Sequence, residues 1–68
     1  VNSYVQLGRV YHANKNYPDG RSVLEEAVQI NPFNPMIYRL LADIYTALGD
    51  QDKAKQAKAT LDKLLTAN

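Results

Sequence analysis

Two eight-residue stretches with the same pattern decide the fold, and they read Tyr4-Val5-Gln6-Leu7-Gly8-Arg9-Val10-Tyr11 and Tyr38-Arg39-Leu40-Leu41-Ala42-Asp43-Ile44-Tyr45. In each stretch an aromatic residue is followed by a leucine, a small residue and a tyrosine at the same internal spacing. The two lie 34 positions apart in a chain of 68 residues. A fixed period of this length is the signature of stacked structural repeats. The chain therefore divides into two units, residues 1–34 and 35–68.

Apolar residues recur every three or four positions in four segments, which is the spacing of one face of a helix. We expect helices over residues 2–14, 18–30, 35–48 and 51–65. The connections between these segments are short, and short connections make neighbouring helices run antiparallel. The sequence therefore predicts an all-α fold of four antiparallel helices.

The expected helix ends carry residues suited to them. Asn34 followed by Pro35 is typical of a cap and the first position of a helix. Gly49 adopts the left-handed conformation that closes many helices without steric cost. At the end of the first helix we expect Asn14 or Asn16 to take that role, because asparagine tolerates the same conformation.

The two units resemble the tetratricopeptide repeat, whose 34-residue helix–turn–helix has Trp, Leu-Gly, Tyr, Ala, Phe and Pro at fixed spacing. The first unit has Tyr4, Leu7, Gly8, Tyr11, Gly20, Leu24 and Pro32 at those positions. The second has Tyr38, Leu41, Ala42, Tyr45, Ala54, Lys58 and Thr66, so the match lapses after Ala54. The resemblance covers the whole chain. It implies one domain of two repeats that begins a right-handed superhelical solenoid.

The resemblance also assigns packing roles. Small residues at the crossing of the two helices in a repeat let their backbones approach closely, which would pair Gly8 with Gly20 and Ala42 with Ala54. The periodic aromatic and leucine positions of the first unit, Tyr4, Leu7 and Tyr11, are expected in the helix–helix core, together with Tyr38 and Tyr45 of the second.

The last helix is more polar than the second, with a narrow apolar stripe and a lysine-rich remainder. Terminal repeats of solenoids need a polar outer face for solubility. We therefore expect residues 35–68 to be the C-terminal cap of a repeat array. The chain opens on Val1, and we expect it to be an excerpt of a longer protein.

By resemblance, the first helix of each repeat lines a concave groove that binds a peptide or helix segment. We expect the chain to be a protein–protein interaction module in the C-terminal part of a larger repeat protein. The expected contact residues are Val5, Gln6, Arg9, His12, Met36, Arg39, Leu40 and Asp43. The alternative is a structural element, a self-association or spacer module appended to a larger protein, an enzyme included, with no ligand of its own.

Two narrower functions are excluded on the same residues. The subclass that clamps the C-terminal carboxylate of chaperones uses lysine and asparagine where this chain has Val5, Arg9 and Leu40. His12 is placed to approach Asp43 on the neighbouring helix, but catalysis would also need a nucleophile or metal beside that pair. We expect no enzyme activity.

Composition excludes further classes of function. There is no cysteine and one histidine, so no metal site and no cofactor is expected. The net charge is +1 with mixed signs, which argues against nucleic-acid binding because phosphate neutralisation needs a basic stripe. No apolar run approaches the roughly 18 residues that insertion across a membrane requires. The expected partner is a protein or peptide, with a homo-oligomer as the alternative, and nothing indicates a compartment.

Overall fold

The computed structural model describes residues 4–66, and four helices account for nearly all of them. They are α1 (Tyr4–Ala13), α2 (Tyr17–Ile30), α3 (Pro35–Leu48) and α4 (Gln51–Thr66), and no strand occurs within this range. The all-α class and the four-helix order are confirmed. The expected start of the first helix at residue 2 lies outside the described residues.

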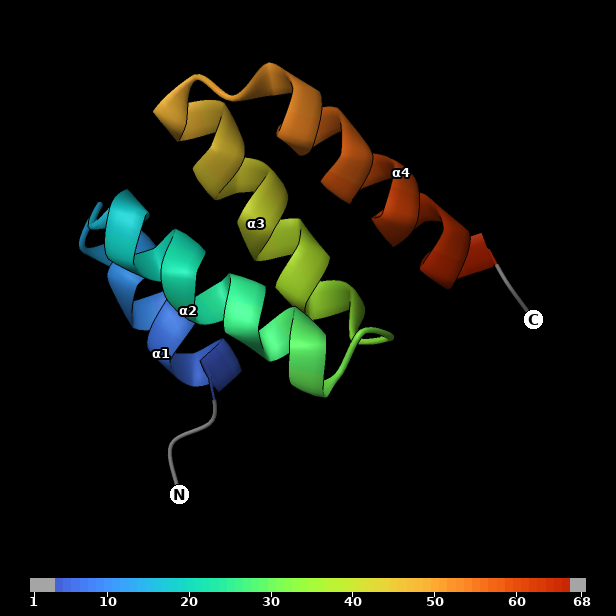
Figure 1. The fold of residues 1–68 in the computed structure, drawn as a ribbon, viewed down its shortest axis with the longest axis horizontal. Coiled ribbons are helices and arrows are strands. Elements are labelled where there is room, and N and C mark those ends of the chain that lie inside the picture. The colour runs from blue at the N-terminus through green and yellow to red at the C-terminus, as the bar shows by residue number, and fades with distance from the viewer. Residues whose placement is uncertain (1–3, 67–68) are drawn as a thin grey trace.

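Short turns join the helices, and each helix runs back along its predecessor (Figure 1). In that view α3 lies between α2 and α4, while α1 lies behind α2. Helix α3 contacts each of the other three helices, whereas α2 and α4 do not touch within the described part of the chain. The third helix is therefore the centre of the fold.

The ends of α3 follow the expected chemistry. The Asn34 side chain accepts a hydrogen bond from the Met36 backbone N–H at 3.0 Å, and Pro35 occupies the first helical position. Gly49 closes the helix with φ +85°, and the Asp50 N–H donates to the Tyr45 carbonyl at 2.8 Å. The predicted roles of Asn34, Pro35 and Gly49 are confirmed.

The end of α1 differs from the prediction. The residue with positive φ is Lys15, at φ +60°, and neither Asn14 nor Asn16. Asn16 precedes α2 with φ −92°, and its side-chain amide donates to the Asp19 carboxylate at 2.9 Å. Asn16 is the residue that precedes the first turn of α2, and the left-handed conformation is adopted by Lys15, one residue before it. A lysine carries a steric cost in that conformation.

The core is built mainly on α3. Its members share low solvent exposure and come from three helices: Leu24, Ala27, Ile37, Leu40, Leu41, Ala42, Ile44, Tyr45, Ala54 and Ala57. Six of these ten belong to α3. Helix α1 contributes only Gly8 to the buried set. Packing on both flanks of α3 thus accounts for most of the buried apolar surface.

The aromatic and leucine positions of the first unit are less buried than predicted. Tyr4 is 42% exposed and Leu7 is 36% exposed, so the prediction that both hold helix on helix is wrong for these residues. The reason is that α1 has α2 and part of α3 as its only neighbours among the described helices. Tyr11 is half-buried.

The small residues of the first unit do sit at a close helix crossing, with a different partner for one of them. A side-chain carbon at Gly8 would meet the side chain of Leu24, whose Cγ would be 2.6 Å away. A side-chain carbon at Gly20 would lie 3.0 Å from Ile44 Cδ1 and 3.9 Å from the Gly8 carbonyl oxygen. Gly8 therefore makes room for Leu24, while Gly20 lies over the backbone of Gly8 and against α3.

Candidate protein-binding surface

The eight predicted contact residues lie on α1 and α3, and most of them face solvent. The exposed members are Gln6, Arg9, Met36, Arg39 and Asp43, and the half-buried members are Val5 and His12. We call these seven residues the α1–α3 surface. The helical period of the repeat places them on one side of each helix, and seven of the eight are exposed or half-buried, as expected. Their role in binding stays a prediction.

Leu40 is the exception, and its prediction as a groove residue is wrong. Its side chain is only 8% exposed and belongs to the core. Leu40 neighbours Ile37 and Ile44 on the α3 surface, three and four positions away, and all three are buried together. Because α3 is packed on several sides, an apolar side chain at the margin of the exposed face lies inward.

One contact joins the two helices across the α1–α3 surface. The imidazole Nε2 of His12 lies 3.7 Å from Oδ2 of Asp43, as the register of the repeats predicted. The ring of His12 also meets the ring of Tyr17 edge-on, with centroids 6.1 Å apart. Both side chains are substantially exposed, so the contribution of this contact to stability is small.

The two arginines of the surface remain available to a ligand. Among residues 4–66, the contact within 4 Å between a basic and an acidic side chain is His12–Asp43. Neither Arg9 nor Arg39 has a carboxylate oxygen within that distance in the same range. A guanidinium presents five donors in a planar fork that matches a carboxylate. The surface therefore offers two cationic hydrogen-bonding groups beside an exposed methionine and a half-buried valine.

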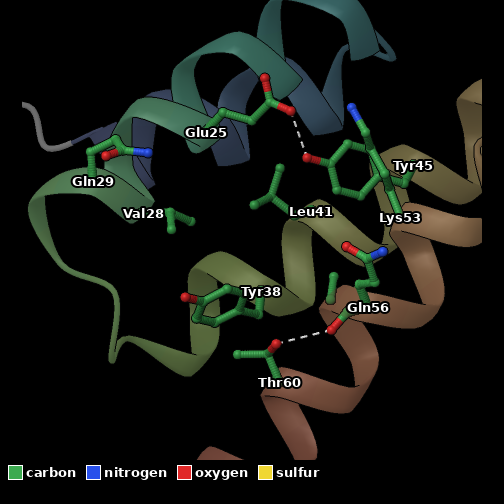
Figure 2. Close-up of a pocket in the computed structure, with 10 residues that line it drawn as sticks. Glu25, Val28, Gln29, Tyr38, Leu41, Tyr45, Lys53, Gln56 and Thr60 are labelled. Carbon is green, nitrogen blue, oxygen red and sulfur yellow. Dashed lines mark hydrogen bonds between the residues drawn. The ribbon is translucent and has the colours of Figure 1, made fainter.

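A second concave feature lies on the opposite side of α3, between α2 and α4 (Figure 2). It has a volume of about 450 Å³. We call it the α2–α4 groove, and it is lined by Glu25, Val28, Gln29, Tyr38, Leu41, Tyr45, Lys53, Gln56, Ala57 and Thr60. The sequence did not predict it, because its two walls come from helices that do not touch and are not consecutive.

A polar network spans one end of this groove. The Tyr45 hydroxyl donates to Oε2 of Glu25 at 2.6 Å, and Lys53 Nζ lies 5.8 Å from the centre of the Tyr45 ring. Burial, and then the hydrogen bond to Glu25, raise the pKa of the Tyr45 hydroxyl well above its ordinary value. The hydrogen bond from Tyr45 to Glu25 connects α3 to α2.

Within the described residues, no cluster of three or more histidine, cysteine, aspartate or glutamate side chains is placed to hold a metal ion. Within the same range, no helix combines the length and apolar character needed to cross a membrane. What the geometry offers is contact area with hydrogen-bonding groups, which suits binding.

Comparison with known proteins agrees with this architecture. The family model for the tetratricopeptide repeat matches residues 11–68, from the end of α1 through α4. No curated protein and no solved structure matches the chain. Repeats of this family are in general non-catalytic modules for protein–protein interaction. With four helices in two helix–turn–helix units and a family match over most of its length, the chain belongs to the tetratricopeptide repeat family.

Proposed function

We propose that the chain binds a peptide or helix segment of a partner protein on the α1–α3 surface. The observation that carries this proposal is the set of exposed side chains that packing brings together from two helices, with His12 and Asp43 in contact at 3.7 Å. Arg9 and Arg39 supply charge-assisted donors, and Val5 and Met36 supply apolar contact. Such a mixture suits a segment that carries both apolar side chains and a carboxylate.

The proposal extends to a longer repeat array. Leu7 and Val10 of α1 occupy the positions that Leu41 and Ile44 occupy in α3, one repeat later. Leu41 and Ile44 are 3% and 0% exposed, whereas Leu7 and Val10 are 36% and 53% exposed. The first repeat buries these positions of α3. Another repeat packed in the same way on α1 would bury Leu7 and Val10. We propose another helix pair of the same kind in the parent protein.

The opposite end of the chain supports a different role. Lys58 of α4 is equivalent to Leu24 of α2, which is fully buried. Asp62 of α4 is equivalent to Val28 of α2. Two charged side chains on this face oppose the docking of a further apolar helix, because burying them unpaired is costly. We propose that α4 is the C-terminal cap of the array, and that residues 1–68 form one domain.

Selection of peptides from a random displayed library against the 68-residue chain tests the binding proposal. The double variant Arg9→Ala Arg39→Ala should weaken one class of selected peptides by about tenfold or more, because charge-assisted hydrogen bonds are lost. The matched control is Lys55→Ala, an exposed cation on α4. If every selected peptide bound the double variant and the control equally well, the α1–α3 surface would not be the binding site.

A second candidate function is self-association, and the exposed apolar face of α1 favours it. Tyr4, Leu7 and Val10 are 42%, 36% and 53% exposed on this one short helix, and contiguous exposed apolar groups often mark interaction sites. Sedimentation at several concentrations separates the two functions. A stable dimer that the double variant Leu7→Glu Val10→Glu dissociates would favour self-association. A monomer at all concentrations would leave partner binding as the function.

A further inference from the structure

The α2–α4 groove is a second surface, independent of the one proposed above. On a helix of 100° per residue, Leu41 in the groove floor and Asp43 on the α1–α3 surface point in nearly opposite directions. Nothing in the proposed function uses the groove. The groove combines an apolar floor with polar walls (Figure 2), and we consider which ligand would fit this lining.

The floor and walls differ in chemistry. Tyr38, Leu41 and Tyr45 of α3 make the floor, and all three are mostly or fully buried. Their polar atoms are already satisfied, since the Tyr38 hydroxyl donates to the Pro32 carbonyl at 2.7 Å and Tyr45 donates to Glu25. Because Leu41 and Tyr45 are almost fully buried, the part of the floor that stays open to a ligand comes mainly from the carbon atoms of Tyr38, which suit an aliphatic side chain.

Each wall of the groove carries one amide side chain. Gln29 extends from α2 and Gln56 from α4, on the two sides of the groove (Figure 2). Each carboxamide both donates and accepts hydrogen bonds. A ligand with N–H and C=O groups along both edges would satisfy both walls. The backbone of an extended peptide has this pattern, with alternate side chains pointing down to the floor.

The charges of the groove favour an uncharged ligand. Glu25 and Lys53 lie on opposite walls at one end of the groove, and their opposite charges offset each other, so the groove has no net charge that would select a charged ligand. Beyond this pair, the lining residues are neutral. Lys53 and Thr60 are seven residues apart on α4, about 10 Å at 1.5 Å per residue. About three residues of extended chain cover that length.

We propose that the α2–α4 groove binds a short, uncharged, extended peptide segment, held through its backbone by Gln29 and Gln56, with an aliphatic side chain against Tyr38. This ligand differs in charge from the carboxylate-bearing ligand of the α1–α3 surface. Its binding should change little between 50 and 500 mM salt, because screening weakens charge–charge contacts and leaves neutral hydrogen bonds in place.

The test is peptide selection from a random library against the 68-residue chain, with sorting of the selected peptides by variant. The double variant Gln29→Ala Gln56→Ala should weaken an uncharged class of peptides by about tenfold, the effect of losing two net hydrogen bonds. Gln51→Ala, an exposed glutamine of α4 outside the groove, is the matched control and should leave the affinity unchanged. Equal thermal melting of the three proteins excludes a folding effect.

Three outcomes would overturn the proposal. One is that no selected peptide depends on Gln29 and Gln56. Another is that the dependent peptides carry a net charge and lose affinity as salt rises. The third is that they bind as helices. Because Arg9→Ala Arg39→Ala should not affect this class of peptides, failure here is distinguishable from failure of the α1–α3 surface.

Discussion

Helices α1 and α3 share one sequence pattern and have different surroundings. Both have an aromatic residue, a leucine, a small residue and a tyrosine at the same spacing, 34 positions apart. Helix α3 packs on α2 and α4 and supplies most of the core, whereas α1 buries a single glycine. A residue's burial in a repeat therefore depends on which neighbours its helix has, and the local pattern alone does not determine it.

The largest expected difference between the two helices is the response to truncation of equivalent side chains. Ile44→Ala should destabilise the fold by about 2–5 kcal/mol, because it opens a cavity at a fully buried site. Val10→Ala, at the equivalent position of α1, should change the free energy of unfolding by less than about 0.5 kcal/mol. Chemical denaturation of both variants measures the contrast. Equal effects would show that α1 is as well packed as α3.

A second comparison concerns the small residues at the helix crossings, where Gly8 and Ala42 are equivalent. Gly8→Ala should destabilise by about 1–3 kcal/mol, because the new carbon would collide with the side chain of Leu24. Leu24→Ala in the same chain should relieve that collision, so the double variant should be more stable than the sum of the single effects predicts. Thermal melting of the three variants gives the coupling. Simple additivity would contradict a contact between Gly8 and Leu24.

The tyrosines that end the two patterns give a smaller effect. Tyr45→Phe should destabilise by about 1 kcal/mol, since the hydrogen bond to Glu25 is lost. Tyr11→Phe should have almost no effect on the free energy of unfolding, because no hydrogen bond of the Tyr11 hydroxyl is seen among the described residues.

Burial of the Tyr45 hydroxyl, and then its hydrogen bond to Glu25, make stability depend on pH. Because the pKa of Tyr45 is raised in the folded state, its contribution is fully present below the ordinary tyrosine pKa of about 10. As pH rises above 10 toward the folded-state pKa, that contribution is lost. Denaturation between pH 8 and 11 should show a fall in stability that is weaker in Tyr45→Phe. An identical fall in both proteins would exclude Tyr45 as its source.

The smallest effect distinguishes the ends of the two helices. Lys15 and Gly49 are equivalent residues, and both have positive φ, at +60° and +85°. Lys15→Gly should stabilise the chain by about 0.5–1 kcal/mol, because the steric cost of a left-handed lysine is removed and part of the gain is offset by backbone entropy. The reverse change, Gly49→Lys, should destabilise. A lower melting temperature for Lys15→Gly would contradict the assigned conformation.

Much of this architecture could be predicted from sequence for local physical reasons. The caps at Asn34, Pro35 and Gly49 depend on side-chain chemistry within one turn of helix, and the structure has them as expected. The His12–Asp43 contact follows from the repeat register, which places equivalent faces of α1 and α3 side by side. The same reasoning predicted the exposure of seven of the eight expected contact residues, and their role in binding stays a prediction.

The remaining features depend on tertiary neighbours. Leu40 is buried because α3 is packed on several sides, and Leu7 is exposed because α1 is not. Lys15 takes the left-handed position because Asn16 serves the next helix. The hydrogen bond from Tyr45 to Glu25 joins residues 20 positions apart with no shared period, and the α2–α4 groove follows from two helices that do not meet. No pattern within a single helix predicts these.

The most direct test of the functional account is a residue-by-residue NMR titration of the 68-residue chain with a peptide whose binding depends on Arg9 and Arg39. We expect shift changes concentrated on the α1–α3 surface, at Val5, Arg9, His12, Met36, Arg39 and Asp43. The backbone signals of Lys55 and Asp62, on the outer side of α4, should stay in place. Shifts centred on α4, with the α1–α3 surface unchanged, would contradict it.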